Sequence, residues 1–305
     1  MIVITILIHL LVLLLMPPLL LGVINKTKAA FAGRVGPPFL QLYYDLARLM
    51  RKGMVFSTTT TWVFRAGPLV TLVAVLIAGL IVPFGPFNSP IRFTGDMVLF
   101  AYLFGLARFF TTTAALDTGS SFEGMGAARE VTFACFSEPA LFLAFLVLAK
   151  LSGSLSLTPM LQAPLSVPFS SLPIASLVLV AAGLFIVLLA ENSRIPVDDP
   201  NTHLELTMIH EVMVLDHSGP LFGAILYGAA VKLLVLSAVL LHVLVPVHTG
   251  WAVVDWMLFV SEMLGIAVTI GVVESVMARL QLRHVPTLLV AASLLCGFGF
   301  LLMLR

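Results

Sequence analysis

Long apolar stretches separated by short polar segments dominate the chain. Eight of them approach the roughly 20 residues that an α-helix needs to cross a hydrocarbon core of about 30 Å: residues 2–24, 66–84, 98–117, 131–150, 172–190, 220–244, 253–278 and 285–304. The pattern predicts an all-α integral membrane protein, with about eight transmembrane helices in a single membrane domain over residues 1–305. The first stretch lacks a basic n-region and a small-residue cleavage site, so we expect a retained helix there.

Positive charge is distributed unevenly between the predicted connections. One side carries Lys26, Lys28, Arg34, Arg48, Arg51, Lys52, Arg65, Arg129, Arg194, Arg279 and Arg283, and the other side carries only Arg92, Lys150 and Arg305. By the positive-inside rule the richer side is cytoplasmic. We therefore expect cytoplasmic loops at about 25–65, 118–130 and 191–219, with both termini on the non-cytoplasmic side.

Composition narrows the class of function. The chain is 60% hydrophobic and 10% charged, with a mean hydropathy of +1.12 and a net charge of +1. It offers no basic stripe for nucleic acid. Its two cysteines, Cys135 and Cys296, lie in apolar stretches without the paired spacing of zinc or iron–sulfur sites. We expect no metal site or redox centre in this chain.

The third polar connection, Glu191–Pro220, concentrates ionisable residues between two uncharged stretches. It reads ENSRIPVDDPNTHLELTMIHEVMVLDHSGP, with six acids, one arginine and three histidines. It can be a solvated loop, but Thr202 and Glu205 fit a capping box that predicts a short helix. If that helix persists, His203, His210 and His217 share one face and can relay protons near neutral pH. A metal ion fits less well, because a seven-residue step covers about 10.5 Å of helix.

Charged residues inside the predicted spans are the second candidate set. They are Arg108, Glu138, Lys232, Glu262 and Glu274. A charge at the bilayer centre costs at least about 2.5–3.5 kcal/mol, so these side chains are expected to face one another or water. They can be structural ion pairs. Glu138 precedes Pro139, which predicts a local helix break beside a carboxylate that is suited to carrying a proton.

Three motifs carry a resemblance to a known family. They are Arg34-Val35-Gly36-Pro37 followed by Leu40-Gln41, Asp45 and Arg48-Leu49; Gly126-Ala127-Ala128-Arg129 followed by Glu138; and Ala190-Glu191-Asn192-Ser193-Arg194-Ile195-Pro196-Val197-Asp198 followed by Glu205-Leu206. In this order they resemble the proton-translocating membrane subunit of respiratory complex I, which forms the NADH-quinone oxidoreductase subunit 1 family. The resemblance implies an amphipathic interfacial helix after the first transmembrane helix, and the cytoplasmic (inner) membrane of a prokaryote.

Two positions depart from complex I and favour a sister family. Asn201 and His203 stand where complex I subunits have glutamates, and the run HLELTMIHEVMVLDHSGP resembles the membrane subunits of group 4 nickel–iron hydrogenases, of the formate hydrogenlyase and hydrogenase-4 types. This resemblance implies a non-catalytic coupling subunit of an oxidoreductase complex. The implied partners are hydrogenase large and small subunits, iron–sulfur subunits and antiporter-like membrane subunits, which would hold the iron–sulfur clusters and the nickel–iron centre.

The resemblance and the charges together give two sets of candidate site residues and no catalytic residue. The proton-path set is Glu138, Asp117, Glu130, Glu191, Asp198, Asp199, Glu205, Glu211, His203, His210, Arg108, Lys232, Glu262 and Glu274, with Glu123 and Asp216 near it. The set for docking a hydrophilic arm, or lining a vestigial quinone-like cavity, is Arg34, Gln41, Asp45, Arg48, Arg129 and Arg194. The first set can instead be a partner-binding surface, and the amphipathic segment an ordinary interfacial helix.

Other function classes remain open at this point. The motifs also suit a quinone-site subunit of a complex-I-type dehydrogenase. A stand-alone secondary transporter would be expected to show paired repeats or interrupted helices in matching halves, and we find no such repeat. A haem-binding cytochrome also stays open because the chain has His9 and His242 in its predicted spans, although histidines in membrane bundles more often hydrogen-bond within the protein.

Overall fold

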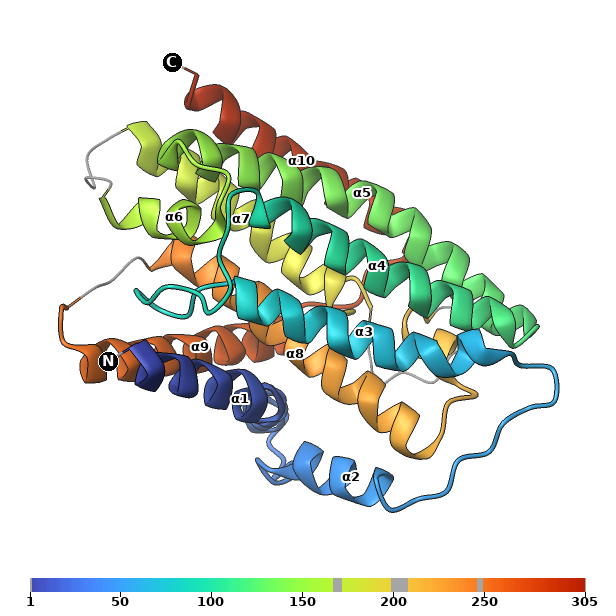
Figure 1. The fold of residues 1–305 in the computed structure, drawn as a ribbon. Helices are drawn as coiled ribbons and strands as arrows, with labels where there is room; N and C mark the ends of the chain where they lie inside the picture. Colours follow the sequence, from blue (N-terminus) through green and yellow to red (C-terminus); the bar gives the residue numbers. More distant parts are fainter. Residues whose placement is uncertain (1, 167–171, 199–207, 246–248, 305) are drawn as a thin grey trace.

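The computed structural model describes residues 2–166, 172–198, 208–245 and 249–304, which form a bundle of α-helices without strands in these ranges (Figure 1). Within them, eight helices are long and apolar enough to cross a membrane, which confirms the predicted fold class. These helices are α1 (Ile2–Phe31), α3 (Trp62–Ile81), α4 (Asp96–Asp117), α5 (Ser121–Ser152), α7 (Leu172–Glu191), α8 (Gly219–Leu244), α9 (Ala252–Val276) and α10 (Val285–Leu302). The shorter elements are α2 (Gln41–Leu49), α6 (Leu157–Gln162) and the 3-10 turns η1 (Ala163–Ser166), η2 (Glu211–Val214) and η3 (Leu282–His284).

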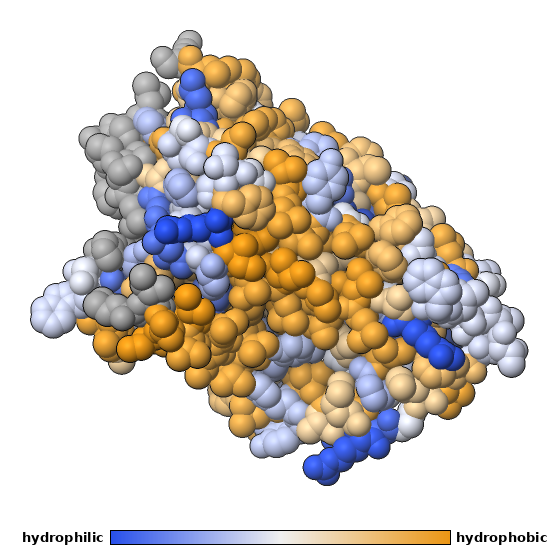
Figure 2. All heavy atoms as spheres, in the orientation of Figure 1, coloured by the Kyte–Doolittle hydropathy of each residue, from blue (hydrophilic) through white to orange (hydrophobic). Residues whose placement is uncertain are grey.

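The two ends of the bundle differ in character. Both chain termini lie at one end, on the left of Figure 1. The other end, here called the polar end, carries residues 32–61, 118–120, 192–198, 208–218 and 277–284. Figure 2 shows apolar residues across the middle of the visible face and hydrophilic residues toward its margins. This distribution matches a protein whose middle lies in the hydrocarbon core of a bilayer.

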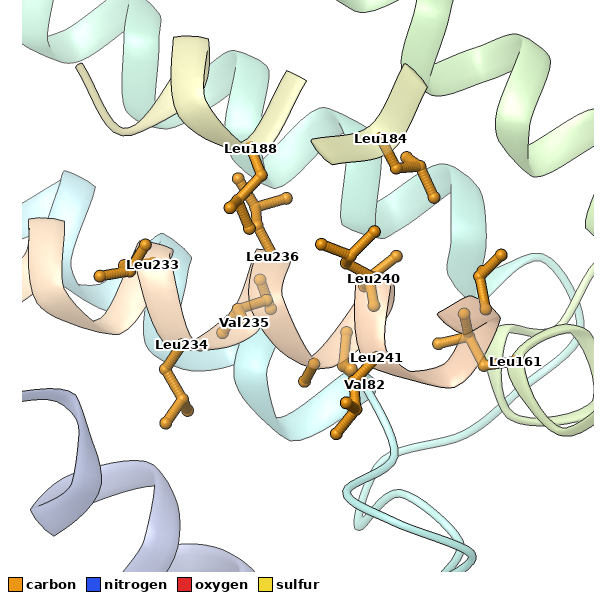
Figure 3. Packing of buried hydrophobic residues seen from close by; sticks show 14 of the residues in the cluster. Val82, Leu161, Leu184, Leu188, Leu233, Leu234, Val235, Leu236, Leu240 and Leu241 are labelled. Atoms are coloured by element: carbon orange, nitrogen blue, oxygen red, sulfur yellow. The ribbon is translucent and has the colours of Figure 1, made fainter. Parts of the chain in front are cut away.

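Helix α8 is the centre of the bundle. Of its most apolar window, 72% is buried, against 28–50% for the other seven membrane-length helices of the described chain. In Figure 3, Leu184 and Leu188 on α7 point toward Leu236 and Leu240 on α8, all within one buried cluster. Lipid tails are as apolar as leucine, so this helix is held by close packing rather than by exclusion from water.

The amphipathic helix expected after the first transmembrane helix is present as α2. Its apolar residues Leu46 and Leu49 face Gly223 on α8, where an added Cβ would come within 4 Å of both. Its other side exposes Tyr44 and Arg48, and none of its residues is fully buried. The helix thus lies across the polar end with one face free.

Two tyrosines from other helices bond carbonyls of α1 close to its prolines. Pro18 has no N–H group, so the carbonyl of Leu14 loses its helical donor. The Tyr227 hydroxyl on α8 donates to this carbonyl at 2.8 Å, and the Tyr43 hydroxyl on α2 donates to the carbonyl of Leu15. The Tyr227 bond replaces the missing helical bond, and the two tyrosine bonds together fasten α2 and α8 to the middle of α1.

The segment after α7 is not a solvated loop in its described parts. Val197 and Ile209 pack with Val285 and Leu289 of α10, and Met213 packs with other buried side chains of α4 and α5. The segment therefore folds back into the polar end and closes it. The condition under which the histidines would share one helical face is not met between His210 and His217, because only the short turn η2 lies between them. The predicted helix start at Thr202–Glu205 lies outside the described residues.

Helix α5 also differs from its prediction. It begins at Ser121 rather than near residue 131, and it continues through Pro139 without the predicted break. Proline is tolerated inside a packed membrane helix, because neighbouring helices and side chains accommodate the freed carbonyl. Glu138 consequently projects from a continuous helix.

Replacing Tyr227 by phenylalanine is expected to destabilise the protein by about 1 kcal/mol, because the carbonyl of Leu14 loses its replacement donor. Thermal denaturation of the purified protein in mild detergent measures the effect. Tyr44→Phe, at an exposed position on α2, is the matched control and should leave the melting temperature unchanged. Equal melting temperatures for Tyr227→Phe and wild type would show that the bond contributes nothing.

Candidate functional site

A group of charged side chains from four helices meets inside the bundle. This central cluster consists of Arg108 on α4, Glu130 and Glu138 on α5, Glu191 at the end of α7 and Lys232 on α8. Arg108 contacts all three carboxylates: its Nη2 lies 2.7 Å from Glu191, its Nε 3.7 Å from Glu130, and its Nη1 bonds Glu138. It lies about 14 Å along α4 from Asp117 at the polar end. One guanidinium, on a membrane-length helix, therefore connects three acids of two other helices.

Glu191 is the most firmly held of these acids. Its carboxylate forms ion pairs with Arg108 and with the Lys232 ammonium at 2.8 Å, and it accepts a hydrogen bond from the Ser137 hydroxyl at 2.7 Å. Only 9% of its side chain is exposed. All three donors stabilise the ionised form. Glu191 is therefore suited to being a fixed anion.

Glu138 has a different environment from Glu191. Its side chain is 47% exposed, and its one ion pair in the described chain is with Arg108. Two cations face three carboxylates in the central cluster, so the cluster carries one negative charge when every acid is ionised. A proton on one carboxylate would neutralise it, which is favourable where the dielectric constant is low. Within the described chain Glu130 and Glu138 each contact Arg108 alone, so either has fewer donors to lose than Glu191, and Glu138 is the more exposed of the two, at 47% against 19%.

Two cavities meet at the central cluster. The first, the polar-end cavity, holds about 70 Å³ and is lined by Arg108, Glu130, Glu191, His210, His217 and Lys232 among others. The second, the lateral cavity, holds about 430 Å³ and reaches the outer surface between α4 and α5, where Tyr102 and Phe142 are exposed. Arg108, Glu191 and Phe104 line both cavities. They form the wall between the two spaces.

Two of the three predicted histidines line the polar-end cavity. Burial lowers the pKa of His210, although Glu130 and Asp198 oppose the shift. Burial also lowers the pKa of His217, against its hydrogen bond to the Phe64 carbonyl. Both rings are therefore mainly neutral at pH 7 and can accept protons transiently. His203 lies outside the described residues.

A second ionic group fastens the folded-back segment to α1 and α9. This clamp consists of Lys28, Arg194, Glu274, Asp198 and Arg279. Glu274, whose side chain is fully buried, forms ion pairs with Lys28 at 2.7 Å and with Arg194 at 3.3 Å. Asp198 pairs with Arg279 at 2.8 Å and accepts the backbone N–H of Ile209 at 3.0 Å. Asp198 thus joins the two described ends of the segment around residues 199–207.

The other candidate acids lie apart from the central cluster. Asp117 accepts the backbone N–H groups of Thr61 and Phe64 and so caps α3, and Glu123 accepts the N–H of Asp216. Glu211 is partly exposed in η2, and Glu262 is partly exposed on α9. Asp199 and Glu205 lie outside the described residues.

The predicted docking residues divide into two groups. Arg34, Gln41, Asp45 and Arg48 lie on or next to α2, where Gln41 and Arg48 both contact Asp45. Arg129 instead donates to the carbonyl of Met208, and Arg194 is buried in the clamp. The first group forms the free polar surface, and the other two arginines hold the folded-back segment.

Neither a haem site nor a metal site is favoured by the geometry. The His9 ring bonds the Gly79 carbonyl at 2.9 Å, and the two nitrogens of His242 lie 2.7 and 3.0 Å from the carbonyls of Ala238 and Gly85. Both rings are thus engaged with the backbone. Across the described ranges, no three His, Cys, Asp or Glu residues are grouped so as to hold a metal ion.

Sequence reasoning missed three residues of these networks. Ser137 gave no signal beyond its place next to Glu138. Lys28 and Arg279 counted only as positive charges at helix ends, yet they pair with Glu274 and Asp198. A search for basic partners of each candidate acid would have selected Lys28 and Arg279 as candidates.

Replacing Arg194 by alanine is expected to cost about 1–3 kcal/mol of stability, because the buried Glu274 keeps only Lys28. Thermal denaturation measures this loss, with the exposed Arg48→Ala as control. Combining Arg194→Met with Glu274→Gln should recover part of the loss, because the buried carboxylate charge is then removed. An Arg194→Ala protein as stable as wild type would rule out the clamp.

Comparison with known proteins agrees with the resemblance seen in the sequence. The family model for NADH dehydrogenase matches residues 3–304. The chain is 31% identical over 301 residues to formate hydrogenlyase subunit 4 of Escherichia coli (strain K12), covering 96% of this chain and 94% of that protein. It is 31% identical over 235 residues to hydrogenase-4 component C of the same organism, covering 77% and 73%.

A solved structure shows the same fold. It is that of the membrane-bound sulfane sulfur reductase, an archaeal respiratory membrane complex, one chain of which superposes with a TM-score of 0.83 at 20% identity over 98% of both chains. The predicted resemblance is confirmed by the family match and by the two relatives. The chain belongs to the NADH dehydrogenase family.

Proposed function

We propose that this protein is the membrane-embedded coupling subunit of a membrane-bound hydrogenase complex of the formate hydrogenlyase or hydrogenase-4 type. Its role is to dock a hydrophilic redox arm and to form part of the proton or ion path. The observation that carries the proposal is the position of Arg108, which contacts three carboxylates and lies between two cavities. The similarity to two hydrogenase subunits supports the type of complex.

The polar end faces the cytoplasm in this proposal. The excess of lysine and arginine in its connections supports that orientation, which places both termini on the non-cytoplasmic side of a prokaryotic inner membrane. The polar-end cavity then faces the compartment of the redox arm. The described parts of the opposite end are packed with apolar side chains such as Phe84, Phe100 and Phe145.

The proposed proton path follows from the difference between Glu138 and Glu191, two of the three acids that contact Arg108. A proton from the polar-end cavity reaches Glu130 and then Glu138, while Glu191 stays ionised under its three donors. When Glu138 is protonated, its hold on Arg108 weakens and the guanidinium turns toward the other two carboxylates. Protons suit the cluster better than sodium, because Arg108 and Lys232 already occupy the positions that a metal cation would take.

The exposed face of α2 is the docking surface in this proposal. Arg34, Gln41, Asp45 and Arg48 offer charge and hydrogen-bonding groups at the polar end, and Tyr43 connects this helix to α1. The partners are hydrogenase large and small subunits, iron–sulfur subunits and antiporter-like membrane subunits. Movement of the docked arm would reach the bundle through α2 and the clamp.

A quinone-site subunit of a complex-I-type dehydrogenase is the second candidate, and the NADH dehydrogenase family match supports it. Purification of the tagged chain in mild detergent, with mass spectrometry of its partners, separates the two. We expect nickel–iron hydrogenase and antiporter-like subunits together with hydrogen-dependent dye reduction. Dehydrogenase partners with bound quinone would favour the second candidate, and a solitary chain that transports ions would favour a stand-alone transporter.

Glu138→Gln is expected to lower hydrogen-driven proton uptake into liposomes at least about tenfold, because the amide cannot carry the proton. Hydrogen-dependent dye reduction and subunit composition should stay unchanged. The matched control is Cys135→Ser, at an exposed position on the same helix. Normal proton uptake by the glutamine variant would remove Glu138 from the path.

A further inference from the structure

His217 occupies an unusual position at the wall of the polar-end cavity. It lies just before α8, is 8% exposed, and stacks on the Phe64 ring with centroids 3.9 Å apart and planes at 26°. Its Nε2 lies 3.3 Å from the carbonyl oxygen of Phe64. A carbonyl oxygen only accepts hydrogen bonds, so Nε2 must carry the hydrogen. The backbone of α3 therefore fixes the tautomer of this histidine.

The fixed tautomer leaves Nδ1 with its lone pair. This atom is buried and has no hydrogen-bond partner in the described part of the protein, while the ring lines the polar-end cavity. A buried acceptor without a donor is destabilising, so a donor from the cavity is favoured. The cavity holds about 70 Å³ and has charged and polar side chains among its lining residues, and one water needs roughly 10–15 Å³. Water is thus the natural donor to Nδ1.

The charges around His217 favour transient protonation. Burial lowers the pKa of the ring, and the neighbouring exposed Asp216 partly offsets this. Arg65 on α3 is held over the Phe56 ring, 4.2 Å from its centroid. The other charged or titratable groups near His217 are Glu123, which accepts the Asp216 N–H, and five residues that line the same cavity: Arg108, Glu130, Glu191, His210 and Lys232. An imidazolium at this position would release its proton readily.

We infer that His217 is the group through which protons enter the polar-end cavity, an inference that rests on the proposed function. A hydronium ion from the polar end gives its proton to Nδ1 and becomes water. The imidazolium keeps its Nε2–H bond to Phe64, then passes the Nδ1 proton to a second water on the side of Glu130 and returns to the neutral form. No bond to carbon forms or breaks, and the ring ends with the tautomer with which it began.

Chemical rescue in the whole complex, reconstituted in liposomes and driven by hydrogen, tests this role. His217→Ala should lower proton uptake at least about tenfold, and added imidazole should restore most of it in proportion to the concentration of the neutral base. His217→Gln keeps a donor for the Phe64 carbonyl but cannot take up a proton, so it should show the same loss with normal assembly. His284→Ala, at an exposed histidine of the polar end, is the control and should behave as wild type.

The outcomes separate this inference from the proposed function. Normal uptake by His217→Ala together with impaired uptake by Glu138→Gln would overturn the role of His217 alone. Normal uptake by both variants would overturn the proposed function and the inference with it. A loss in His217→Ala that imidazole does not restore, with normal uptake by His217→Gln, would show that the ring is structural and would overturn the inference.

Discussion

The guanidinium of Arg108 is the interaction on which the rest of the site depends. It lies within a membrane-length helix, where an isolated charge is costly, and it is stabilised by three carboxylates from α5 and α7. These carboxylates in turn depend on Arg108 and Lys232, because removing one partner of a buried pair leaves an uncompensated charge. The result is a cluster in which one proton more or less changes the balance of charge. That property makes it suitable for coupling rather than only for stability.

The fold keeps this cluster in place from two directions. Helix α8 provides Lys232 from the most buried part of the bundle, and the segment after α7 folds back to cover the polar end. Within the clamp, Glu274 joins that segment to α1 and α9 through Arg194 and Lys28, and the bonds of Tyr43 and Tyr227 join α1 to α2 and α8. A displacement of α2 would therefore reach α1 and α8 through contacts that are already formed.

The sequence was sufficient to predict the eight membrane-length helices and the set of intramembrane charges, because length, hydropathy and cost of burial are local properties. The amphipathic α2 was predicted from the resemblance of its motif to a known family. It was not sufficient to predict which charges meet. Arg108 and Glu191 are far apart in the chain, and their contact depends on how α4 and α7 pack. The segment after α7 looked solvated because its acids dominate its composition, yet Val197, Ile209 and Met213 are buried with apolar residues of the bundle. Pro139 suggested a break in α5 that neighbouring packing prevents.

Infrared difference spectroscopy of the whole complex, recorded as hydrogen reduces it, tests the central claim most directly. The account predicts a change in the C=O stretch of a protonated carboxylic acid that shifts in deuterium oxide and is absent from the Glu138→Gln complex. The same band should persist in the Cys135→Ser complex. A carboxylic acid band that is unchanged by Glu138→Gln would contradict the account, because the proton would then reside on another group.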